Sequence, residues 1–159
     1  MYHTIVVPLD GSEVAEQVLP YVRDLVQHRT TQIHLISVAP LSSSVSASAA
    51  QVSLYPLVMS SADLELHAHE RERIGQELTN YLRGIAIDLA QGNVTTHVEV
   101  RFGEPAEEII AYTQDVQADL IAMCTHGRTG LARWAYGSVA EKVMRHAHCP
   151  VLLVRAKAG

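Results

Sequence analysis

The sequence predicts an α/β fold: a single-domain, open, five-stranded parallel sheet with helices on both faces. Two observations carry this prediction. Short apolar runs alternate strictly with longer segments of helical apolar spacing from residue 1 to residue 159. Most of these runs are continuous and rich in branched residues, which is typical of parallel strands covered on both faces. With 48% apolar and 18% charged residues, 159 residues fit one domain that buries its own core.

The first strand begins at 5–7 and ends in the turn residues 10–12. Helical spacing of apolar residues then predicts a first helix from this turn to about residue 28. Pro20 lies inside that helix and lacks a backbone N–H. We therefore expect it to bend the helix or to remove one hydrogen bond.

The second strand covers 32–38, and the segment after it differs in kind. Residues 41–61 are rich in serine and show no usable periodicity. A stretch of this length without a pattern is long for a compact domain, so it is either mobile or a lid. We favour a mobile, partly disordered loop with at most one short helical turn, and no second domain follows it.

Helical spacing returns over 62–91 and stops at a Gly-Asn pair. The first half of this helix carries His67 and His69 beside Glu70, a combination that also occurs in metal sites. On a helix, however, residues two apart point in different directions. The pattern therefore favours a solvated helix face over a metal site.

The remaining elements continue the alternation. Residues 94–101 alternate apolar with polar, which predicts a third strand with one wetter face, as at a sheet edge. Glu104-Pro105 opens a third helix, with proline at an early helical position. The fourth strand, the fourth helix and the fifth strand are expected at 119–123, 138–146 and 149–155.

The segment 124–138 combines glycines 127, 130 and 137 with Arg128 and Arg133, between a strand and a helix. Backbone amides at glycines and a helix N-terminus can hold an anion, most often phosphate. A tight strand-to-helix crossover explains the same glycines, and spacing alone leaves both interpretations open. Ligands of such sheets bind at the carboxyl ends of strands where the strand order reverses. We expect 124–138 to face residues 8–10 across that crevice.

Composition and charge exclude several classes of protein. A net charge of −5 disfavours non-specific binding to nucleic acid or to an anionic membrane. No apolar run approaches the roughly 20 residues of a membrane span, and the first residues lack the pattern of a signal peptide. The two cysteines lie far apart and give no disulfide framework. These features together predict a cytoplasmic protein.

Several motifs together resemble the universal stress protein family over essentially the full length. They are Ile5-Val-Val-Pro-Leu-Asp-Gly-Ser12, Thr125-His-Gly-Arg-Thr-Gly130, Gly137-Ser138 and Cys149-Pro-Val-Leu-Leu-Val154. The resemblance implies a Rossmann-like sheet of strand order 3-2-1-4-5 and a homodimer joined through strand five, Val151–Val154. Unpaired, that apolar edge would be prone to aggregation, and two-fold pairing covers it.

For one branch of the family, the resemblance also implies a site for ATP, with Mg²⁺, or for AMP or another adenine nucleotide. That branch's motif is Gly, two residues, Gly, nine residues, then Gly followed by Ser or Thr. Gly127 and the pair Gly137-Ser138 match its second and third parts. The implied binding residues are Pro8, Asp10, Val38, Gly127, Arg128, Gly130, Gly137, Ser138 and Val139.

Each of these roles has a simpler alternative. Asp10 is suited to a ribose hydroxyl or to the adenine edge, yet it also suits the cap of the first helix. Val38 packs either on adenine or in the ordinary core. Ser138 reaches a phosphate or forms a capping box with Glu141.

Cys124 stands where the family motif has its first glycine. Three accounts of this departure are open. A backbone with positive φ would make cysteine cost about 1 kcal/mol or more. A close approach of ligand would let its side chain crowd the ribose or a phosphate. A simple strand end would make it harmless. A disulfide with Cys149 is not expected, because the two lie at opposite ends of neighbouring parallel strands.

The function implied is an ATP-binding, dimeric stress-response or signalling protein without a dedicated catalytic reaction. Nucleotide occupancy would alter 41–61 and hence the binding of a protein partner. One alternative is an interaction module of the same fold in which Cys124 spoils the site. Another is a weak ATPase, although the sequence has no Gly-x4-Gly-Lys-Ser/Thr loop and no evident water-activating base.

Overall fold

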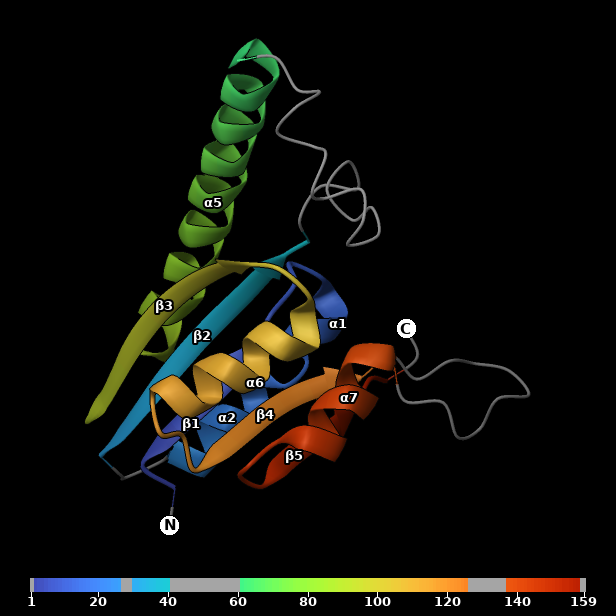
Figure 1. Cartoon of the computed structure of the whole chain (residues 1–159). Helices are drawn as coiled ribbons and strands as arrows, with labels where there is room; N and C mark the ends of the chain where they lie inside the picture. Colours follow the sequence, from blue (N-terminus) through green and yellow to red (C-terminus); the bar gives the residue numbers. More distant parts are fainter. Residues whose placement is uncertain (1, 27–29, 41–60, 126–136, 158–159) are drawn as a thin grey trace.

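Five parallel strands form the sheet in the computed structural model, which describes residues 2–26, 30–40, 61–125 and 137–157 (Figure 1). In chain order these strands are β1 (Thr4–Pro8), β2 (Thr31–Ala39), β3 (Val94–Phe102), β4 (Leu120–Thr125) and β5 (Val151–Arg155). Their order across the sheet is β3-β2-β1-β4-β5, and every pairing is parallel. The predicted fold class and strand order are therefore confirmed.

Helices cover both faces of the sheet. One face carries α1 (Glu13–Glu16), α2 (Leu19–Val26) and α5 (Ser61–Leu89), and the other carries α6 (Pro105–Asp115) and α7 (Ser138–His146). Each face has its own apolar cluster, because successive side chains of a strand point to opposite sides. Ile5 and Val7 of β1 pack with α2 and α5, whereas Val6 between them packs with α6 and α7.

The helix expected from the first turn to about residue 28 is in fact two helices. α1 ends at Glu16, and the N–H groups of Gln17 and Val18 bond to carbonyls only three residues back. Pro20 is the second residue of α2, where a helix needs no N–H from it. The prediction of a single helix is therefore wrong, and the interruption lies at Gln17 and Val18, ahead of Pro20.

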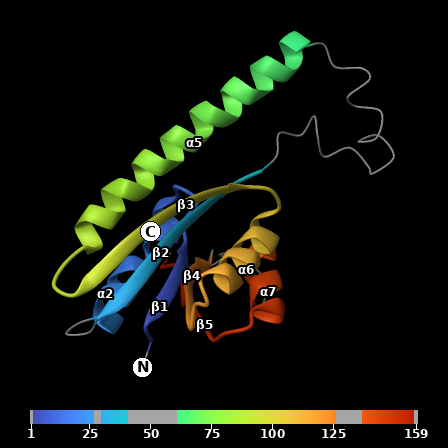
Figure 2. The ribbon, with the colours of Figure 1, turned by 60° about the vertical axis from the view of Figure 1, so that its left-hand side comes forward.

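The outer elements follow the pattern of their sequences. β3 lies at one edge of the sheet, as its alternation predicted, and α5 confirms the long helix that was expected from 62 to 91. Figure 2 shows that the N-terminal part of α5 projects beyond the sheet. His69 is exposed and His67 half-buried on this part, as expected of a largely solvated face.

Some expectations concern residues outside the described ranges. The loop expected at 41–61 falls there except for its last residue, and so do His126, Gly127, Arg128, Gly130 and Arg133. Both cysteines are free thiols, as expected. Within the described ranges, no helix combines the length and the apolar character that crossing a membrane requires.

Candidate functional site

A crevice of about 330 Å³ opens at the carboxyl end of the sheet, where β1 and β4 lie side by side. This volume is within the range of small-molecule sites. Residues 8–10 line it, and so do the described residues of the segment 124–138 that was expected to face them: Cys124, Thr125, Gly137 and Ser138. The full lining is Pro8, Leu9, Asp10, Ser12, Val14, Ala15, Ile36, Val38, Pro105, Ile109, Met123, Cys124, Thr125, Gly137, Ser138, Val139 and Ala140.

The turn between β1 and α1 forms one wall of the crevice. Asp10 does not cap α1, contrary to one interpretation of its position. Ser12 is the cap, and its hydroxyl oxygen accepts a hydrogen bond from the N–H of Ala15 at 3.1 Å. Asp10 Oδ1 instead accepts from the Ser12 hydroxyl at 2.6 Å and from its N–H at 3.0 Å. The exposed carboxylate therefore organises the turn while lining the crevice.

The N-terminus of α7 forms the opposite wall. Ser138 is the first residue of this helix rather than its cap, so the capping-box interpretation with Glu141 is wrong. The cap position belongs to Gly137, and no side chain of the described residues caps the helix. The N–H groups of 138–140 precede the first helical bond, which runs from Glu141 N–H to Gly137 C=O. They leave a partial positive charge at the crevice.

Thr125, the last residue of β4, fixes where α7 begins. Its hydroxyl oxygen accepts from the N–H of Gly137 at 3.3 Å, and its carbonyl accepts from the N–H of Ala156 at 3.0 Å. The end of β4, the start of α7 and the end of β5 are thereby held together. In the sequence, Thr125 stands out only as part of a motif, and that motif does not predict its role at the start of α7.

The floor of the crevice is apolar. Val38 lines it, as predicted, together with Ile36, Ile109 and Met123. Val38 is half-buried and packs against the cluster under α6 and α7, so it is both a core residue and a crevice residue. An apolar floor beside polar walls suits a ligand with an aromatic ring at one end and anionic groups at the other.

Cys124 lies within β4, paired with Val154 of β5; it lines the crevice and packs against the apolar cluster under α2 and α5. Among the described residues other than glycine, Gln117 alone has a positive φ, so Cys124 carries no backbone strain of that kind. The account based on positive φ is therefore wrong. Burial raises the pKa of the Cys124 thiol, which disfavours the reactive thiolate at neutral pH.

Similarity to known proteins identifies the family of this chain. The model of the universal stress protein family matches residues 1–155. The chain belongs to the universal stress protein family. It is 33% identical over 155 residues to the universal stress protein MJ0531 of Methanocaldococcus jannaschii, a match that covers 98% of this chain and 83% of the relative.

Solved structures of other proteins share the fold. The hypothetical protein MJ0577, from the same archaeon, superposes with a TM-score of 0.76 at 26% identity, covering 100% of this chain and 99% of the other. A universal stress protein family member from Arabidopsis thaliana, solved with AMP bound, superposes with a TM-score of 0.60 at 16% identity. That match covers 98% of this chain and 93% of the Arabidopsis chain.

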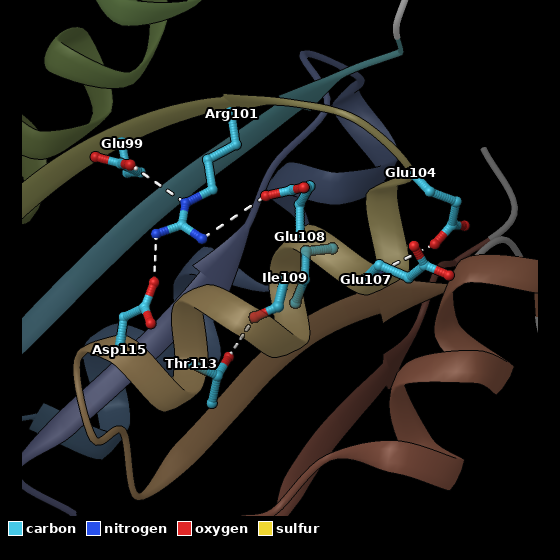
Figure 3. A network of polar contacts seen from close by, with 8 residues as sticks. All are labelled: Glu99, Arg101, Glu104, Glu107, Glu108, Ile109, Thr113 and Asp115. Atoms are coloured by element: carbon cyan, nitrogen blue, oxygen red, sulfur yellow. Dashed lines mark hydrogen bonds and ion pairs between the residues drawn. The ribbon is translucent and has the colours of Figure 1, made fainter. Parts of the chain in front are cut away.

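In this universal stress protein, α6 supplies Pro105 and Ile109 to the crevice, and polar contacts hold the helix at both ends. Figure 3 shows Arg101 of β3 among three carboxylates, with Asp115 of α6 at 2.6 Å from its guanidinium. At the other end, Nζ of Lys142 on α7 lies 3.2 Å from Oε2 of Glu104, which caps α6. Nothing in the sequence pattern predicts the contacts of Arg101 with Asp115 and of Lys142 with Glu104, which join residues 14 and 38 positions apart.

Proposed function

We propose that this universal stress protein binds an adenine nucleotide in the crevice at the carboxyl end of its sheet. The observation that carries the proposal is the meeting of three features within one cavity of about 330 Å³. They are the uncapped N-terminus of α7, the carboxylate of Asp10 and the apolar floor at Val38. These features match the phosphates, the ribose hydroxyls and the purine of a nucleotide.

Different described residues would contact different parts of the nucleotide. The purine would rest on the floor formed with Val38 and Pro8, and Asp10 would accept hydrogen bonds from ribose hydroxyls. The N–H groups at the start of α7, from Ser138 and Val139, would hold phosphate oxygens. Gly137 has no Cβ and keeps that approach open.

Further phosphate contacts would come from Gly127, Arg128 and Gly130, in the segment between β4 and α7. We propose ATP, accompanied by Mg²⁺, as the ligand, and AMP as the principal competitor. The AMP held by the Arabidopsis protein supports the choice of an adenine nucleotide. The bound nucleotide would act as a regulatory ligand, and it would not be a substrate.

Calorimetry with the purified chain tests this proposal. We expect heat on titration with MgATP, and AMP should compete in the same site. Asp10→Asn should weaken binding about tenfold or more, because a charged hydrogen bond to the ribose is lost. Asp88→Asn, an exposed carboxylate on α5 that does not line the crevice, is the matched control. Absence of heat, together with no nucleotide released on denaturation, would favour an interaction module that binds no nucleotide.

We further propose that two copies pair through β5. This strand lies at the edge of the sheet beside β4, and Val151, Leu152 and Leu153 on it are half-buried. Edge pairing across a two-fold axis would cover them and satisfy the outer row of backbone groups. Leu153→Lys should shift the chain from dimer to monomer in sedimentation. A wild-type chain that sediments as a monomer would contradict the proposal.

A further inference from the structure

Tyr81 connects the long helix α5 to the wall of the crevice. Its hydroxyl donates a hydrogen bond to Glu16 Oε1, at the end of α1, over a distance of 3.0 Å. The two residues lie 65 positions apart in the chain, and the contact is part-buried. Tyr81 itself does not line the crevice, so it cannot touch a ligand there.

Glu16 belongs to the short helix α1 that follows the turn carrying Asp10. Ser12 caps α1, and Asp10 Oδ1 accepts hydrogen bonds from the Ser12 hydroxyl and N–H, so α1 and this turn are joined. Burial raises the pKa of Tyr81, as do its bond to Glu16 and the nearby charges of Glu16 and Asp10, so the hydroxyl keeps its proton. A protonated hydroxyl can donate to the Glu16 carboxylate.

Gly11 is the part of this turn that most needs support. Its φ is +82°, in the left-handed region, and glycine has the greatest conformational freedom to lose there. The turn is fixed on its other side by β2. Leu9 N–H donates to Ile36 C=O at 2.8 Å, and the hydroxyl of Ser37 donates to Leu9 C=O at 2.6 Å.

Asp10 therefore lies between two sets of contacts, one to β2 and one to α5. The contacts to β2 come from Ile36 and Ser37 in the sheet, whereas the contact to α5 depends on the single hydroxyl of Tyr81. We infer that Tyr81 is a positioning residue for nucleotide binding, holding α1 and, through the Ser12 cap, the turn at Asp10 so that Asp10 faces the crevice. This inference rests on the nucleotide function proposed above.

The ring and the hydroxyl of Tyr81 have separable roles. The ring packs against the apolar cluster between the sheet, α2 and α5, and Tyr81→Phe preserves that packing. Only the hydroxyl reaches Glu16 of α1. A purely structural role would show in the free energy of unfolding, whereas a positioning role also shows in ligand affinity.

A double-mutant cycle isolates the hydrogen bond. Glu16→Gln and Glu16→Ala both remove the charge, but only glutamine keeps an acceptor for the Tyr81 hydroxyl. We expect Glu16→Ala to bind MgATP about three- to tenfold more weakly than Glu16→Gln, in line with one lost hydrogen bond. The same pair made in the Tyr81→Phe background should bind equally, because no donor remains.

The matched control is Tyr21→Phe, which removes an exposed hydroxyl from α2 and should leave affinity unchanged. Urea unfolding of every variant separates lost stability from lost affinity. Equal affinities of Glu16→Gln and Glu16→Ala with Tyr81 intact would overturn the inference while the proposed function stands. Absence of MgATP binding by the wild type would overturn the proposed function and this inference with it.

Discussion

The hydroxyl of Tyr112 on α6 lies 2.9 Å from Nδ1 of His34 on β2, and this hydrogen bond is buried. The other neighbour of the His34 ring is His97 of β3, stacked with ring centroids 4.5 Å apart and planes 18° from parallel. The contact joins α6 to the sheet two residues before Ile36, which lines the crevice. His34 is 7% exposed, so its protonation state matters to the whole layer.

The first prediction concerns acid stability. Burial, with a smaller effect of His97, lowers the pKa of His34 from 6.5 to about 4. The unfolded chain therefore binds more protons at this residue between those values, so stability is present above pH 6.5 and is lost as pH falls towards 4. The loss should reach about 3 kcal/mol at most.

Urea unfolding from pH 7 to pH 4.5 measures this loss. His34→Gln removes the titrating group and should flatten the curve in that window. His69→Gln, which changes an exposed histidine on α5, should leave the slope unchanged. If wild type and His34→Gln lose stability in parallel, the acid sensitivity comes from another group.

The second prediction compares two arginines that each pair with several carboxylates. Arg101 is 22% exposed and serves Glu99, Glu108 and Asp115. Arg101→Met should lower the free energy of unfolding by about 1–3 kcal/mol, because the partly buried Glu99 and Glu108 and the exposed Asp115 all lose their counter-charge. Arg73 pairs as closely, at 2.6 Å, but is 56% exposed, so Arg73→Met should change stability little.

Chemical unfolding of the two variants side by side measures this difference. Because the bonds of Arg73 are as short as any of Arg101, bond length alone would predict equal effects. Equal losses would show that burial does not decide the strength of these ion pairs.

The third prediction separates two roles of glycine at the crevice. Gly137 has φ −55°, and a Cβ added there would meet no described atom within 4 Å. Gly137→Ala should therefore preserve stability, while its methyl group narrows the approach to the N-terminus of α7 and weakens MgATP binding. Gly11→Ala, at φ +82°, should instead cost about 1 kcal/mol of stability.

Calorimetry and thermal unfolding of both variants test this contrast. Unchanged MgATP affinity in Gly137→Ala would mean that the glycine serves only the strand-to-helix crossover. A stability loss in Gly137→Ala as large as that of Gly11→Ala would contradict the backbone argument.

The fourth prediction concerns Cys124. Since this residue has no positive φ, glycine there relieves no strain, and Cys124→Gly should lose about 1 kcal/mol from the interior of a strand. We expect its affinity for MgATP to stay within about threefold of the wild type. Calorimetry showing a gain of tenfold or more would instead mean that the thiol crowds the ligand.

The sequence predicts more of the fold than of the site. The continuous apolar runs predict five parallel strands because burial on both faces demands such runs, and all five are present. Cap positions were predicted less well. Asp10 and Ser138 are each one or two residues from the true caps, Ser12 and Gly137, and the residue types alone do not distinguish these neighbours.

The contacts that hold the elements around the crevice cannot be predicted from neighbouring residues in the sequence. Tyr81 with Glu16, and Tyr112 with His34, are 65 and 78 residues apart. In the sequence, each tyrosine is one residue of a predicted helix. Core packing already explains the spacing of apolar residues in that helix, so nothing marks the tyrosine as a hydrogen-bond donor to a distant residue. Only the strand order and the register of the layers bring these partners together.

The hydrogen bond from Gly137 to Thr125 has a consequence for engineering. It joins the two residues that flank the segment 126–136, so the framework holds the two attachment points of that segment close together. The cost of closing such a loop rises slowly with its length. A replacement segment of different length or charge therefore needs to span only the short gap between Thr125 and Gly137, which the scaffold itself maintains.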